Sequence, residues 1–123
     1  MPIPSRLMGL SFPAASAINA CGDVTDNLTA IGTTQANALA LFTAVNIVTV
    51  AAAGTGVVLM PAEASAEVDV FNLGANPVLV YPFRATDVIN ALGAGAGFSV
   101  AAGKAAKFRG RANGTGWVTI LSA

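Results

Sequence analysis

The chain has 123 residues and a formal net charge of zero, with only 10% charged residues, one cysteine and no histidine. This length fits one domain that can bury a core without disulfides or metals. The missing histidine removes the commonest general base and metal ligand. Because about 25% of an ordinary soluble domain is charged, this composition favours an oligomer or a component of a larger assembly. The alternative is simply a low-charge globular domain.

Residues 1–26 are predicted to form an extended N-terminal arm, followed by a β domain over residues 27–123. Pro2, Pro4 and Pro13 exclude a regular element from the first dozen residues. The arm carries apolar side chains, which are costly to leave in water. We therefore expect it to pack on a neighbouring protein, the alternative being that it folds back over its own domain. The candidate contact residues of the arm are Ile3, Arg6, Leu7, Leu10 and Phe12.

The stretch from Asn27 to Ala62 contains no charged residue. It is long enough to suggest a membrane span, but polar residues and glycines interrupt it and no basic cluster flanks it, so we expect no membrane partner. A strand is predicted at Asn27–Gly32, followed by either a short helix over Gln35–Phe42 or irregular structure. Strands at Asn46–Val50 and Val57–Met60 flank a loop of small residues.

The segment Glu67–Tyr81 is predicted to be the central hairpin of the domain. Its first part alternates polar and apolar residues, as in a half-buried strand. Leu73–Pro77 supplies turn chemistry through glycine, asparagine and proline. Val78–Tyr81 is a continuous β-branched and aromatic run, typical of a strand covered on both faces.

The remaining chain repeats this pattern of short strands and small turns. A brief strand is predicted at Val88–Asn90, and a tight hairpin at Ala101–Lys104 would join the strands on either side of it. Asn113-Gly114 is the strongest short hairpin signal in the chain, and the last strand follows it. About seven or eight strands at roughly ten-residue spacing indicate an all-β fold, an antiparallel sandwich or barrel.

Two groups of charged residues are candidates for chemistry. Glu67 and Asp69 share one face of a strand, roughly 7 Å apart, a spacing that would suit a paired-carboxylate hydrolase or a calcium site. A solvated strand face is the simpler interpretation, and no other acid is tied to the pair by spacing. With Trp117, the two acids would also fit a carbohydrate-binding or carbohydrate-active β-sandwich. We expect no catalytic residue, cofactor or metal.

Four basic residues form a stripe on and beside one predicted strand. No aromatic platform is interleaved with them and the net charge is zero, so we expect no nucleic-acid partner. Salt bridges to an acidic protein surface, or protection of an edge strand, explain the stripe better. Its members are Lys104, Lys107, Arg109 and Arg111.

A succession of segments gives the chain a family resemblance over residues 27–121. The segments are Gly32–Leu39, Val48–Leu59, Asn72–Pro82, Ile89-Asn90, Phe98–Lys104 and Trp117. In order and spacing they resemble small structural proteins of tailed bacteriophages, found among head decoration (cement) and fibre components.

The resemblance implies a β-rich virion protein without enzymatic activity. It implies a homotrimer on the outer surface of the capsid that binds the major capsid protein and stabilises its lattice. The alternative is a head- or tail-fibre component that acts as a joining or receptor-facing module. Phe71 is an additional candidate contact, because it is too apolar to leave exposed at the centre of the domain.

Overall fold

The computed structural model describes residues 23–122 as a body built of strands and loops, without a helix. An all-β chain is therefore confirmed over this range, whereas the contact residues predicted in the arm lie outside it. The described range contains ten strands, including the two-residue strands β2 and β7, where the sequence predicted seven or eight.

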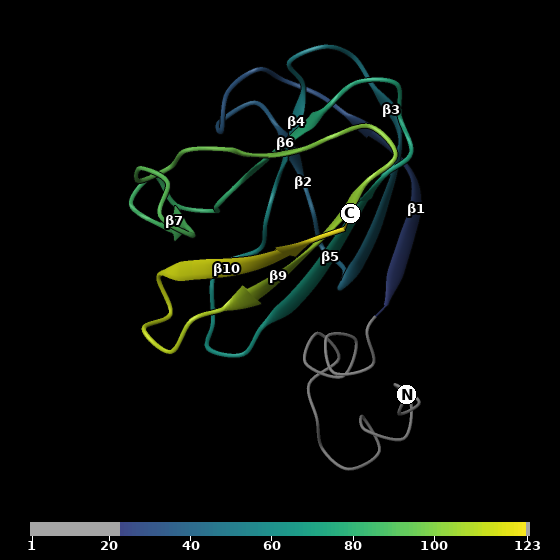
Figure 1. The fold of residues 1–123 in the computed structure, drawn as a ribbon. Helices are drawn as coiled ribbons and strands as arrows, with labels where there is room; N and C mark the ends of the chain where they lie inside the picture. Colours follow the sequence, from purple (N-terminus) through teal and green to yellow (C-terminus); the bar gives the residue numbers. More distant parts are fainter. Residues whose placement is uncertain (1–22, 123) are drawn as a thin grey trace.

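The strands form two sheets (Figure 1). In order across the six-stranded sheet they are β1 (Val24–Ala30), β3 (Val45–Ala51), β5 (Glu67–Asn72), β9 (Ala105–Gly110), β10 (Gly116–Leu121) and β7 (Val88–Ile89). Across the four-stranded sheet they are β2 (Leu39–Ala40), β4 (Gly56–Val58), β6 (Val78–Tyr81) and β8 (Phe98–Val100).

The first six strands alternate between the two sheets, so the chain winds from one to the other and back. Each turn of this coil lays a strand parallel to the preceding strand of the same sheet: β3 pairs with β1 and β5 with β3, while β4 pairs with β2 and β6 with β4. The remaining strands add three antiparallel pairs, β5–β9, β9–β10 and β6–β8, and one parallel pair, β7–β10. The prediction of an antiparallel fold is therefore wrong for the first six strands and for β7. Apolar patterning reports which face of a strand is buried and carries no information about the direction of its neighbour.

The segment Glu67–Tyr81 is not a hairpin, because β5 and β6 lie in different sheets. Asn72 ends β5, and its buried side chain holds the corner that follows. Its Nδ2 donates to Asn76 O at 2.8 Å and to Val100 O at 2.9 Å, while its Oδ1 accepts from Gly74 N at 3.0 Å. Turn residues mark where a strand ends, and both corners and hairpins use them.

The turn at Ala101–Lys104 is also a corner, since it joins β8 in one sheet to β9 in the other. It lies against the corner after β5, because Gly103 N donates to Asn72 O and Asn72 N donates to Lys104 O. The hairpin predicted at Asn113-Gly114 is confirmed: β9 and β10 pair in antiparallel fashion, and Gly114 has a φ of 69°. The strand predicted near Val88 is confirmed as β7.

Two local predictions near the start of the domain need correction. No helix forms over Gln35–Phe42, where Thr34 O accepts from the amides of Asn37 and Ala38 to close a single turn. Strand β1 begins at Val24, so residues 24–26, which the sequence placed in the arm, belong to the sheet. A parallel neighbour, β3, supplies the backbone partners that make this extension possible.

The two sheets share one apolar core. Inward-facing residues of β3, β5, β9 and β10 meet those of β4, β6 and β8, and the rings of Phe98 and Phe108 pack edge to face at 5.8 Å across the two layers. Phe108 and Trp117 are the largest fully buried side chains. Their strands alternate inward and outward residues as the sequence predicted. The described residues include no helix capable of spanning a membrane.

Candidate functional site

The exposed side of the six-stranded sheet gathers the charged residues that the sequence singled out. Cross-strand partners point to the same side of a sheet, and the register places Asp69 opposite Lys107, and Glu67 opposite Arg109. It also sets Phe71 beside Ile47 in β3. We call this surface the outer sheet face; its members are Ile47, Glu67, Asp69, Phe71, Lys107, Arg109, Val118 and Ile120.

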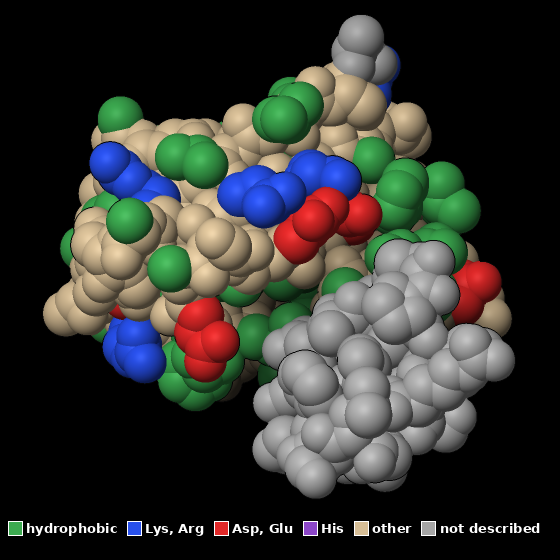
Figure 2. Space-filling view, turned by 90° about the horizontal axis from the view of Figure 1, so that it is seen from below, with side chains coloured by type: hydrophobic (Ala, Val, Ile, Leu, Met, Phe, Trp, Pro, Cys, Tyr) green, Lys and Arg blue, Asp and Glu red, His purple; other side chains and the backbone are tan. Residues whose placement is uncertain are grey.

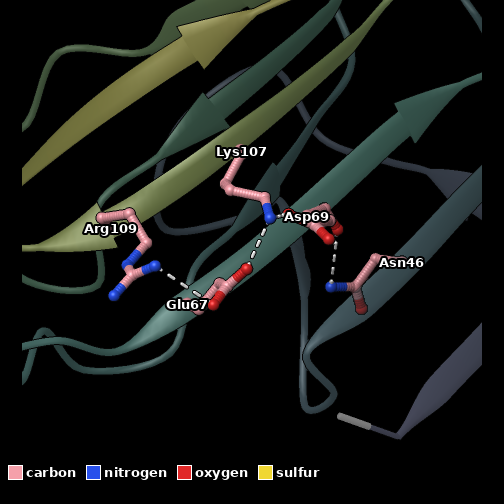
Figure 3. A network of polar contacts seen from close by, with 5 residues as sticks. All are labelled: Asn46, Glu67, Asp69, Lys107 and Arg109. Atoms are coloured by element: carbon pink, nitrogen blue, oxygen red, sulfur yellow. Dashed lines mark hydrogen bonds and ion pairs between the residues drawn. The ribbon is translucent and has the colours of Figure 1, made fainter.

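Ion pairs link β5 to β9 at the centre of the outer sheet face (Figure 3). Lys107 Nζ lies 2.5 Å from Glu67 Oε1 and 3.9 Å from Asp69 Oδ1, while Arg109 contacts Glu67 Oε2 at 3.2 Å. Figure 2 shows Lys and Arg side chains lying directly against Asp and Glu side chains on one side of the molecule. The acids and bases at this site therefore neutralise one another.

The two carboxylates of this cluster have different surroundings. The hydrogen bond from Lys107 lowers the pKa of Glu67, and the same bond raises the pKa of Lys107. Burial raises the pKa of Asp69, an effect that the nearby Lys107 charge only partly offsets. The two carboxylates of a general acid–base pair also have different pKa values. In this cluster, however, both oxygens of Glu67 are ion-paired, one with Lys107 and the other with Arg109.

Asn46 supports the cluster from the neighbouring strand. Its fully buried side chain donates from Nδ2 to Asp69 O at 3.3 Å and to Thr43 O at 2.9 Å, and its Oδ1 accepts from Thr43 Oγ1 at 2.9 Å. The polar backbone at the junction of β3 and β5 is thereby fixed. This arrangement ties β5 to β3 beside the ion-pair cluster.

Apolar side chains flank the ion pairs on the outer sheet face. Ile120, opposite Lys107, is 71% exposed, Val118, opposite Arg109, is 45% exposed, and Phe71 is 38% exposed. Phe71 and Ile120 also line a shallow hollow of about 360 Å³. Exposed apolar side chains gathered on one face are typical of a protein–protein contact surface.

A second hollow, which we call the groove, runs along the segment that leads into β5. It has a volume of about 780 Å³ and is lined by apolar residues including Phe42, Met60 and Trp117, together with the acids Glu63, Glu67 and Asp69. The segment before β5 is fixed there because Ser65 N donates to Gly110 O and Gly110 N donates to Ala66 O. A Cβ at position 110 would overlap the carbonyl oxygen of Glu63, so this close approach requires glycine.

The basic stripe is divided by the fold. Lys107 and Arg109 are paired with acids of β5, which the sequence could not foresee because the two strands are some forty residues apart. Strand β9 lies between β5 and β10, so protection of an edge strand is the wrong explanation for these residues. Arg111 lies just beyond the end of β9, in the turn to β10, and is exposed.

Trp117 is fully buried and therefore offers no stacking surface to a sugar, which argues against the carbohydrate site predicted with Glu67 and Asp69. Its Nε1 has no hydrogen-bond partner among the described residues. Asp87 is a further buried polar group that the sequence analysis missed, since it reads as an ordinary loop residue. It has no exposed surface, and its nearest cation is Arg84 at 3.7 Å.

Residues 23–122 contain no cluster of three or more acidic, cysteine or histidine side chains suited to a metal ion. Comparison of the chain with protein-family models, with curated proteins and with solved structures gave no match.

Proposed function

We propose that the chain is a structural protein of a tailed-phage virion. In this role it decorates the outside of the head as a homotrimer and stabilises the lattice of the major capsid protein. The observation that carries the proposal is the composition of the outer sheet face, where exposed apolar side chains surround acids and bases that are already paired. The resemblance noted over residues 27–121 points to the same class.

The described body has the properties that a decoration protein needs. A decoration protein needs a stiff scaffold that presents a contact surface, and buried asparagines fix the corners and strand junctions here. We further propose that the two sheets be classed as an open sandwich. A trimer would bind a capsid through three equivalent contacts, and such multivalency can raise avidity by about 10²–10⁴ over one contact.

The test is binding to particles. Purified protein mixed with expanded heads of its phage should cosediment up to a saturating ratio, and decorated heads should withstand heating better than bare ones. Absence of cosedimentation, together with density for the protein at a fibre in a reconstruction of the intact particle, would favour the fibre role instead.

A further inference from the structure

We propose that residues 1–22 of the same chain occupy the groove. This inference does not depend on the proposed function, because it concerns the isolated chain. The groove is a hollow of about 780 Å³ beside the start of β5, and its wall includes Phe42, whose side chain is 77% exposed. A large aromatic side chain left in water at the edge of a hollow marks a surface that gains free energy when it is covered.

The point at which the segment joins the described body lies close to the groove. The described body begins at Asp23, whose carbonyl oxygen accepts a hydrogen bond from Val45 N at 3.0 Å, and Val45 lines the groove. Phe12 precedes Asp23 by 11 residues. An extended chain of that length spans roughly 35–40 Å, more than twice the roughly 13 Å radius of gyration of a 100-residue domain. Every apolar residue of the segment can therefore reach the groove of its own chain.

The chemistry of the groove matches the segment. The segment offers one base, Arg6, no acid and seven large apolar side chains: Met1, Ile3, Leu7, Met8, Leu10, Phe12 and Ile18. The groove offers apolar walls and three acids. Glu67 and Asp69 are paired with Lys107, whereas Glu63 has no ion pair among the described residues. Arg6 is thus the complement of Glu63.

Trp117 also borders the groove, so its indole reports on what covers the groove. Attachment to the same chain favours this occupant over a second copy, because a short tether gives an effective concentration in the millimolar range.

A double-mutant cycle in the full-length chain tests the inference. One variant carries Leu7→Ser, Leu10→Ser and Phe12→Ser, the second carries Phe42→Ser, and the third combines them. If the segment covers Phe42, Phe42→Ser lowers the folding equilibrium constant about tenfold and the triple change lowers it by a larger factor. The combination costs clearly less than the product of the two. Phe83→Ser is the control, since Phe83 is exposed and does not line the groove, and its effect should multiply with that of the segment variant.

Trp117, the single tryptophan of the chain, gives an independent readout. The segment variant should shift its emission to longer wavelength, because the surroundings of the indole at the groove become more polar, and Phe83→Ser should not. Independent effects of the segment and Phe42 variants, together with unchanged tryptophan emission, would overturn the proposal. An unfolding midpoint that rises with protein concentration, in place of a constant one, would assign the groove to the segment of a second copy and also overturn it.

Discussion

Glu67 and Asp69 lie two residues apart on β5, yet the fold moves the pKa of each in an opposite direction. The lowered pKa of Glu67 means that its ionisation stabilises the folded state above its ordinary pKa of 4.5, and this contribution is lost as the pH falls through the folded pKa. The raised pKa of Asp69 means that its ionisation costs stability at neutral pH, and this cost is absent at pH values below its ordinary pKa of 3.8.

Neutral replacements of these two acids should therefore have opposite effects. We expect Glu67→Gln to lower the free energy of unfolding at pH 7 by a small amount, because its ion pairs are exposed and screened by salt. Asp69→Asn should raise the free energy of unfolding, because the neutral side chain removes the cost of burying a charge. Urea unfolding at pH 7 and pH 3 measures both effects.

At pH 3, below the ordinary pKa of Asp69, the effect of Asp69→Asn should shrink towards zero. The effect of Glu67→Gln should be smaller than at pH 7 and should vanish as the pH falls through the folded pKa of Glu67. In 1 M NaCl at pH 7, the effect of Glu67→Gln should also shrink. A destabilising effect of Asp69→Asn at pH 7 as large as that of Glu67→Gln would show that the Lys107 charge outweighs burial at Asp69 and would contradict this prediction.

At the scale of elements, the corners between strands determine how the two sheets connect. The corners at Leu73–Pro77 and Ala101–Lys104 lie against each other, and Asn72 bonds to both through its backbone and side chain. Neither corner has the direct strand-to-strand pairing that holds a hairpin together. The amide of Asn72 therefore replaces hydrogen bonds that a hairpin would make between its strands.

We expect Asn72→Leu to destabilise the protein by about 3–5 kcal/mol, because it leaves one donor and two acceptors in the corner without partners. Asn113→Ala is the matched change in the β9–β10 hairpin, where the side chain accepts one exposed bond from Thr115 N. That variant should cost about 0.5–1 kcal/mol. Urea unfolding measures both, and equal losses would show that the corner does not depend on Asn72.

At the scale of the whole molecule, the outer sheet face is the surface through which we expect copies to associate. Phe71 lies on this face at 38% exposure, so a polar residue there can be solvated without disturbing the core. Phe71→Glu should convert the proposed trimer to a monomer that keeps its β structure. Light scattering measures the mass, and circular dichroism measures the fold.

Leu92→Glu is the control for this change, because Leu92 has nearly the same exposure, 39%, and lies in the loop after β7 rather than among the residues of the outer sheet face. It should leave the oligomer intact. A Phe71→Glu protein that remains trimeric would place the subunit interface elsewhere on the molecule.

The sequence alone determined the all-β class, the position of most strands, their inward and outward faces and the hairpin at Asn113-Gly114. These features depend on residues close in the chain, where alternation and turn chemistry act directly. It also identified Glu67, Asp69, Lys107 and Arg109 as the notable charges, but as two unrelated groups.

Only the tertiary structure decided which strands are neighbours and in which direction they run. The coil of parallel strands brings β5 between β3 and β9, and this placement converts a carboxylate pair and a basic stripe into one neutralised cluster. Glu67 and Lys107 are 40 residues apart, and no local pattern encodes a contact at that distance. Pairing is selected by the burial of all the strands together, so it emerges only when the whole core is assembled.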